Sequence, residues 1–128
     1  EKEKLKKQIE EKFLKEGLTP KNFEEILIEF KERYKAAKEL FQGLIREGIL
    51  VKVSEKLVYH KKILEEIEKK VIDFLIKNKE MTLSDFRAIL GSRISRKYLI
   101  PLAEYLDKKK ITLRIGDKRI LRKKFSFF

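Results

Sequence analysis

Apolar residues recur at helical spacing three times in the first half of the chain. The spacing predicts a helix that ends at Gly17, a second helix with Thr19 as N-cap and Pro20 at its first position, and a third helix that ends at Gly48. The apolar positions are Leu5, Ile9, Phe13 and Leu14, then Phe23, Ile26, Leu27 and Phe30, then Ala36, Ala37, Leu40, Phe41, Leu44 and Ile45.

A predicted hairpin follows the third helix. Apolar residues alternate with others from Ile49 to Val53, which is typical of a strand, and residues 57–59 predict a second strand after a turn at residues 54–55. The order of elements is therefore helix, helix, helix, hairpin.

The second half repeats this order of helices. A long helix is predicted to end near Asn78, a second to begin at a cap provided by Thr82 or Ser84 and to end at Gly91, and a third to begin after the cap Ser95. The apolar positions are Ile63, Ile67, Val71, Phe74 and Leu75, then Phe86, Ile89 and Leu90, then Leu99, Leu102, Ala103 and Leu106.

Strand signals flank these helices. Met81 fits a short strand before the second helix, and residues 111–115 alternate into Gly116 and Asp117. A glycine at the first position of a two-residue loop suits a type II′ hairpin turn.

An offset of 62 residues aligns the last helix and hairpin of the two halves without a gap. Three helices followed by a hairpin, or wing, form a winged helix, a variant of the helix-turn-helix. We therefore predict an α+β, mostly helical chain with two tandem winged-helix domains, residues 1–60 and 61–128. The matched apolar pairs are Leu40 and Leu102, Leu44 and Leu106, Ile49 and Ile111, Val51 and Leu113, Val53 and Ile115, and Val58 and Ile120.

Charge is divided unevenly between the two halves. Residues 1–60 hold 14 Lys and Arg against 12 Asp and Glu, whereas residues 61–128 hold 19 against 9, and the whole chain carries +12. An excess of this size in one half indicates a polyanionic partner such as nucleic acid.

Composition excludes several classes of protein. The 128 residues contain no cysteine and one histidine, His60, which excludes disulfides and cysteine zinc sites and leaves His60 as an expected surface or junction residue. No apolar run is long enough to span a membrane, and the start is no signal peptide. We expect a cytoplasmic monomer without cofactor, from a thermophile given its richness in Lys, Glu and Ile, and a fragment of a longer protein.

The two halves share their apolar positions but differ in their charged ones. With the same offset, Arg96 aligns with Tyr34 and Arg114 aligns with Lys52. Five of the eight arginines fall within residues 93–122. The planar arginine group bonds phosphate, pairs with guanine or stacks on unpaired bases. We predict a basic cleft between the start of the third helix and the wing; a solvated, charge-rich surface is the alternative.

Two elements are expected to form this cleft. Arg93, Arg96 and Lys97 lie at the start of the third helix, where backbone N–H groups and the positive end of the helix dipole also favour phosphate. In the first wing strand the apolar residues take one face, so Thr112 and Arg114 are expected on the other, within reach of a partner.

Two further residues have both a functional and a structural interpretation. Tyr98 fits stacking on a base as well as half-buried packing at the start of a helix. Asp117 fits acceptance from a base amino group as well as an ordinary role in the turn.

The segment from Met81 to Lys124 resembles the last winged helix of the bacterial selenocysteine-specific elongation factors, the SelB family. The resemblance rests on the motifs MTLSDFRAILG, SRKYLIPLAEYLD and ITLRIGDKRILRK, and the first half matches only in layout. One departure is an insertion at residues 92–94, between Gly91 and the SRKY motif. With the cleft, the resemblance gives these candidate RNA-binding residues: Arg87, Arg93, Ser95, Arg96, Lys97, Tyr98, Arg114, Gly116, Asp117, Lys118, Arg119 and Arg122.

The resemblance implies binding to an mRNA stem-loop, the selenocysteine insertion element, during UGA recoding. GTP, selenocysteinyl-tRNA and, indirectly, the ribosome would be partners of the longer factor. The sequence has no G-x-x-x-x-G-K-S/T phosphate loop, so we expect no GTPase or other enzyme activity from this chain.

Two other functions remain open. A winged helix that regulates transcription places its third helix in the major groove of duplex DNA, but Pro101 and the apolar residues around it leave few side chains free to contact bases. A protein-interaction module of a translation or transcription assembly is the second alternative. For residues 1–60 we expect a structural role as a spacer.

Overall fold

The computed structural model describes residues 1–91 and 93–122 and divides the chain into two compact units, Glu1–Leu64 (unit 1) and Glu65–Phe128 (unit 2). The division falls inside the helix that follows residue 60. Every helix within the described ranges is too short or too polar to span a bilayer. The same residues contain no cluster of three or more His, Cys, Asp or Glu that could hold a metal ion.

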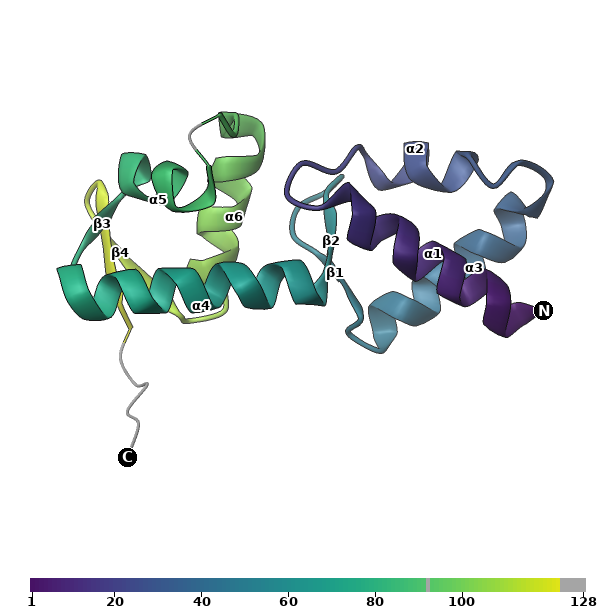
Figure 1. Cartoon of the computed structure of the whole chain (residues 1–128), viewed down its shortest axis with the longest axis horizontal. Coiled ribbons are helices and arrows are strands. Elements are labelled where there is room, and N and C mark those ends of the chain that lie inside the picture. The colour runs from purple at the N-terminus through teal and green to yellow at the C-terminus, as the bar shows by residue number, and fades with distance from the viewer. Residues whose placement is uncertain (92, 123–128) are drawn as a thin grey trace. The chain divides into compact units, whose positions relative to one another are not determined.

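Unit 1 contains three α-helices, a short 3-10 helix and a two-stranded antiparallel hairpin (Figure 1). The helix periodicity predicted the three α-helices and the alternation predicted the hairpin, whereas the 3-10 helix was not predicted; α1 ends at Gly17 as expected. The elements are α1 (Lys2–Glu16), α2 (Phe23–Ile28), η1 (Lys31–Arg33), α3 (Tyr34–Arg46), β1 (Leu50–Lys52) and β2 (Val58–His60).

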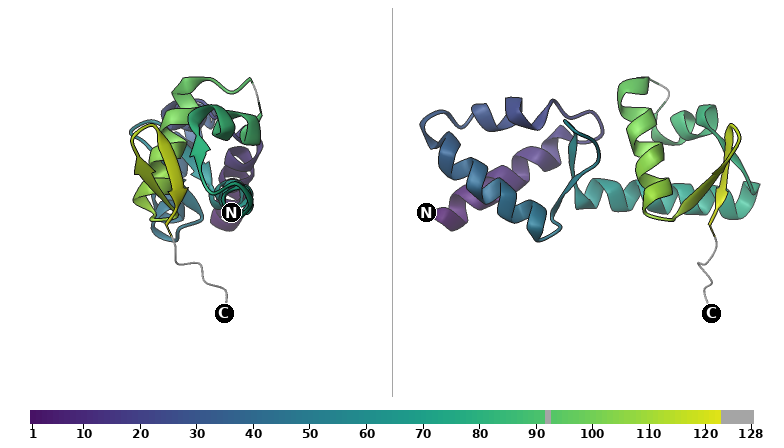
Figure 2. Two further views of the ribbon diagram at one scale, coloured as in Figure 1. Left: turned by 90° about the vertical axis from the view of Figure 1, so that its left-hand side faces the viewer. Right: turned by 180° about the vertical axis from the view of Figure 1, so that it is seen from behind.

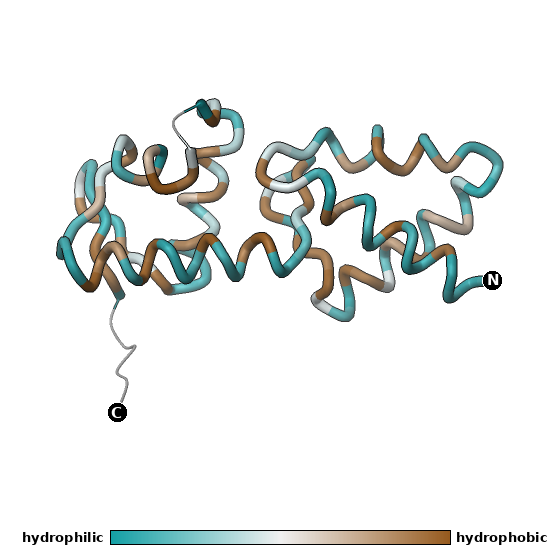
Figure 3. Tube along the Cα trace, in the orientation of Figure 1, coloured by the Kyte–Doolittle hydropathy of each residue, from teal (hydrophilic) through white to brown (hydrophobic). Residues whose placement is uncertain are grey.

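Aromatic packing forms the centre of the unit 1 core. The ring of Phe41 on α3 stacks on Phe13 of α1, with centroids 5.5 Å apart, and on Phe23 of α2, with centroids 5.1 Å apart. Apolar residues recur along all three helices (Figure 3). Each helix therefore contributes one apolar stripe to a shared core.

The predicted N-cap of α2 is wrong. The N-cap of α2 is Asn22, whose Oδ1 accepts a hydrogen bond from Glu24 N at 2.9 Å, and Pro20 is buried ahead of the helix instead of opening it. Asn is as good a cap as Thr, so tertiary packing decided between them.

His60 is buried, not exposed as expected. It is 1% exposed; its Nε2 lies 2.9 Å from Glu10 Oε2, and its Nδ1 accepts a hydrogen bond from Lys62 N at 3.0 Å. These partners fix the tautomer with the proton on Nε2. The imidazole thereby satisfies a free backbone N–H at the start of the following helix.

Unit 2 has the element order and sheet of a winged helix, which confirms the predicted fold class. Its antiparallel sheet has the strand order β3-β5-β4, and the hairpin β4–β5, the wing, starts at the end of α6 and runs back toward the start of α5 (Figures 1 and 2). The elements are α4 (Lys61–Asn78, which begins in unit 1), β3 (Met81–Thr82), α5 (Leu83–Leu90), α6 (Arg96–Lys108), β4 (Thr112–Ile115) and β5 (Lys118–Leu121).

Both caps predicted for unit 2 are present. Thr82 forms a capping box, in which its Oγ1 accepts from Asp85 N at 3.0 Å and Asp85 Oδ2 accepts from Thr82 N at 2.9 Å. Ser95 is the N-cap residue of α6.

The two units share left-handed residues at equivalent positions. The 62-residue offset places Lys79 (φ 68°) on Gly17 (φ 63°) and Lys110 (φ 67°) on Gly48 (φ 77°), in each case just after a helix. Helices commonly end in this conformation, which glycine adopts without a steric penalty. The repeat is thus visible in the backbone even where residue types differ.

Lys110→Gly is expected to stabilise unit 2 by about 1 kcal/mol, because it relieves the steric cost of a left-handed L-residue. Urea unfolding followed by hydrogen exchange of α6 amides measures the change. Lys69→Gly, within α4, is the control and should destabilise by about 1 kcal/mol. A loss of stability in Lys110→Gly would contradict the assignment of strain to this position.

Candidate nucleic-acid interface

The start of α6 presents cations and backbone donors together. Arg93, Ser95, Arg96 and Lys97 are exposed, and the side chain of Ser95 makes no capping hydrogen bond. The N–H of Tyr98 donates to Ser95 O at 3.1 Å, whereas the N–H groups of Arg96 and Lys97 have no partner within the described residues. These two groups are left for solvent or a ligand, at the end of the helix dipole that favours anions. The predicted cationic helix start is present.

Tyr98 is half-buried and lies below a cation. Lys97 Nζ is 5.3 Å from the centroid of its ring. This arrangement corresponds to the packing interpretation, and the lysine lies over one face of the ring.

The wing has a two-residue loop, as predicted. Ile115 pairs with Lys118 across Gly116 and Asp117, Gly116 has φ 65°, and Asp117 is not among the residues with positive φ. A positive φ at the first loop residue alone is the signature of a type II′ turn.

The faces of β4 are reversed from those predicted. Thr112 is 1% exposed, whereas Leu113 and Ile115 are 41% and 55% exposed. Arg114 lies on the same face as Thr112, directly across from Arg119 of β5. The polar face of the wing therefore points toward α6, and its apolar face points to solvent.

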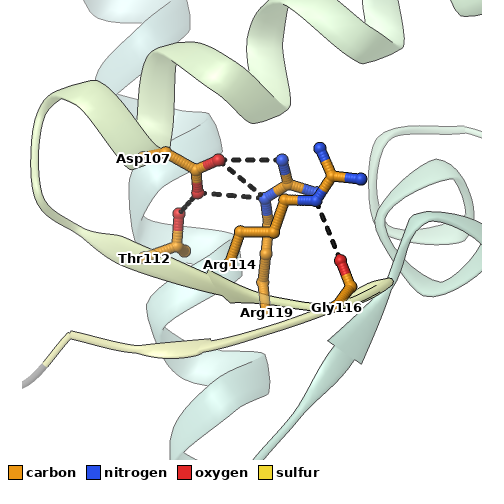
Figure 4. A network of polar contacts seen from close by, with 5 residues as sticks. All are labelled: Asp107, Thr112, Arg114, Gly116 and Arg119. Carbon is orange, nitrogen blue, oxygen red and sulfur yellow. Dashed lines mark hydrogen bonds and ion pairs between the residues drawn. The ribbon is translucent and has the colours of Figure 1, made fainter.

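Asp107 of α6 explains the reversal (Figure 4). Its Oδ2 accepts from Arg119 Nη2 at 2.8 Å, its Oδ1 accepts from Arg119 Nε at 3.0 Å, and Oδ1 also accepts from Thr112 Oγ1 at 2.6 Å. Paired in this way, polar groups tolerate burial. Arg119 is only 4% exposed and does not present its guanidinium at the surface, which departs from its prediction as a phosphate contact.

A pocket of about 250 Å³ lies between α6 and the wing. Arg114 stays exposed there, and its Nε donates to the carbonyl of Gly116 at 2.9 Å. The lining combines three arginines, two acidic residues and three apolar residues: Arg96, Arg114, Arg119, Glu104, Asp117, Leu83, Ile100 and Ala103.

The pocket thus brings together four of the predicted residues, Arg96, Arg114, Asp117 and Arg119. Sequence reasoning missed Glu104 and Asp107. The signal for Asp107 was an acid in the last turn of a helix, where the dipole disfavours negative charge.

Other predicted residues lie outside the pocket lining and have local roles. Arg87 Nε donates to Ile94 O at 3.0 Å and so holds the segment before α6, whose inserted Ser92 is outside the described residues. Lys118 Nζ lies 3.0 Å from Glu80 Oε2, and this hydrogen bond raises the pKa of the lysine. The backbone N–H of the half-buried Arg122 donates to Ile111 O at 2.9 Å.

The sequence is similar to known proteins of one family. The family described as elongation factor SelB, winged helix, matches residues 73–121. The chain is 41% identical over 120 residues to the selenocysteine-specific elongation factor of Desulfomicrobium baculatum, a match that covers 94% of this chain. It spans 19% of the length of that relative.

Two solved structures share the fold. One is the mRNA-binding domain of elongation factor SelB from E. coli in complex with SECIS RNA, with a TM-score of 0.61 and 24% identity over 70% of this chain and 73% of that one. The other is a bacterial selenocysteine-specific elongation factor, EF-Sec, with a TM-score of 0.60 and 28% identity over 67% of this chain and 14% of that one.

Proposed function

The chain belongs to the family of SelB elongation factors through its winged helix at residues 73–121, and on this premise we propose that unit 2 binds an mRNA stem-loop, the selenocysteine insertion element. The observation that carries the proposal is the pocket that joins Arg96 of α6 to Arg114 of the wing. One ligand can contact both elements there.

The two kinds of charge in the pocket suit two parts of a nucleotide. Arg96 and Arg114, with the exposed Lys97 that follows Arg96 in the sequence, bind phosphates on the two sides of a hairpin tip. The carboxylates of Glu104 and Asp117 repel phosphate but accept hydrogen bonds from base amino groups. The apolar residues Leu83 and Ile100 also line the pocket. The pocket therefore receives an unpaired base, which loops provide and duplexes do not.

Unit 1 has no comparable site at the equivalent positions, which supports a role as a spacer. Tyr34, in place of Arg96, donates through its hydroxyl to Glu24 Oε1 at 3.1 Å. Lys52, in place of Arg114, has its Nζ 5.4 Å from the centroid of the Phe23 ring.

In the longer factor, we infer that this chain tethers to the message the part that carries selenocysteinyl-tRNA and uses GTP. The chain matches only 19% of the length of a selenocysteine-specific elongation factor, and this partial match motivates the inference. The chain itself acts by binding and not by catalysis, in the cytoplasm where translation occurs.

The full chain is expected to bind a stem-loop at least tenfold more tightly than a duplex of matched length. The probe is the stem-loop that follows the in-frame UGA codon of a selenoprotein message, titrated by fluorescence anisotropy against RNA and DNA duplexes. Affinity should fall steeply with salt, because each neutralised phosphate contributes about 0.7 to 0.9 to the slope of log K against log salt concentration. Equal affinity for stem-loop and RNA duplex would refute loop recognition, and a preference for DNA duplex would favour a DNA-binding regulator.

A further inference from the structure

Asp107 occupies an electrostatically unfavourable position for a helix residue. It lies in the last turn of α6 (Arg96–Lys108), where the dipole places partial negative charge. An acid at this end must find compensation elsewhere in the structure. The compensation lies in the wing.

The carboxylate of Asp107 holds both strands of the wing. Arg119 on β5 donates to both of its oxygens, and Thr112 on β4 donates to Oδ1 at 2.6 Å (Figure 4). The guanidinium and carboxylate planes meet in a fork, which fixes orientation as well as distance. One side chain of α6 therefore sets the position of the hairpin against that helix.

This arrangement also determines the charge of the pocket. Arg114 and Arg119 are direct cross-strand partners, and two like charges in that relation repel. Asp107 neutralises Arg119, whereas Arg114 has no ion-pair partner within residues 1–91 and 93–122. Of the two wing arginines, only Arg114 is therefore available to a phosphate.

We propose that Asp107 is a positioning residue for RNA binding, which acts through Arg119 to hold the wing so that Arg114 faces Arg96 across the pocket. This inference rests on the proposed function of unit 2. It also gives Arg119 and Thr112 a common role, as the two wing residues through which α6 orients the hairpin.

Asp107→Asn separates positioning from simple electrostatics because the two predict opposite signs. Removal of an acid near an RNA site strengthens binding when charge alone acts. If Asp107 positions the wing, Asp107→Asn instead weakens stem-loop binding by about tenfold, which corresponds to 1.4 kcal/mol. The control is Asp73→Asn, the same change at an exposed residue of α4, which should leave affinity within twofold. Unchanged or tighter binding by folded Asp107→Asn would overturn the proposal.

A second experiment compares variants of the two cross-strand arginines, Arg114 and Arg119, and tests the proposal even if Asp107→Asn does not fold. Arg114→Met removes a phosphate contact, so the salt slope falls by about 0.7 to 0.9. Arg119→Met should weaken binding while the slope stays that of the unaltered chain. An equal loss of slope in Arg119→Met would make Arg119 a phosphate contact and refute the proposal. If the unaltered chain shows no preference for the stem-loop, the proposed function fails instead, and the two failures are distinct. Thermal unfolding monitored by circular dichroism verifies that each variant is folded.

Discussion

Replacement of Arg96 and Arg114 together by alanine is expected to weaken stem-loop binding by at least about a hundredfold, or 2.8 kcal/mol. Each arginine is expected to form charge-assisted hydrogen bonds with phosphate, which contribute about 1.5 to 3 kcal/mol apiece. Both side chains are exposed, so their loss should leave the stability of unit 2 nearly unchanged. Anisotropy titrations at several salt concentrations measure both the affinity and the slope, which should fall by about 1.4 to 1.8.

The matched control for this double variant comes from unit 1. Lys35→Ala with Lys52→Ala removes the same amount of charge from the corresponding helix and wing, at the positions equivalent to Lys97 and Arg114. This control should bind within a few-fold of the unaltered chain. If both double variants lose affinity equally, net charge and not the pocket governs binding. Unchanged nucleic-acid binding in the Arg96 and Arg114 double variant would instead favour the protein-interaction alternative.

Phe41→Ala is expected to destabilise unit 1 by about 3 to 5 kcal/mol, the usual cost of a large cavity in an aromatic core. Phe41 is 3% exposed and stacks on both Phe13 and Phe23, so its removal leaves two rings without their partner. Hydrogen exchange of α1 and α3 amides during urea unfolding measures the loss. The control Ile28→Ala, at a residue 62% exposed, should change stability by less than about 0.5 kcal/mol.

The same variant tests the spacer role of unit 1. Stem-loop affinity of Phe41→Ala should stay within a few-fold of the unaltered chain, because the proposed RNA contacts lie in unit 2. A collapse of affinity while α6 amides remain protected would show that unit 1 contributes to binding, against the expectation of a spacer.

Sequence patterns predicted the helices well because each helix buries one apolar stripe and several begin or end at a recognisable residue. Gly17, Gly91 and the caps Thr82 and Ser95 are local signals that tertiary structure did not override. The cap at Thr19 was wrong because Asn22, three residues later, offers an equivalent acceptor. A choice between two good caps depends on packing that lies outside the local sequence.

The wing was predicted in outline but not in orientation. Alternation identifies the two faces of a strand without identifying which one faces the helix. The apolar face with Leu113 and Ile115 was expected to be buried, yet both residues are exposed. The polar face is buried instead because Asp107 of α6 accepts a hydrogen bond from Arg119. That outcome depends on one residue in a different element, so the sequence alone did not show that Arg119 is buried against Asp107.

The exposed apolar face of the wing has a consequence for the protein without its ligand. β4 is one of the two edge strands of the sheet, whose order is β3-β5-β4, and its residues Leu113 and Ile115 are exposed. Such edge strands template pairing with other copies of themselves, and natural proteins interrupt them with charge. Arg114 stands between the two apolar residues and is the only charged residue of the strand. The residue expected to bind RNA is therefore also expected to hinder self-association of the free protein through its own wing.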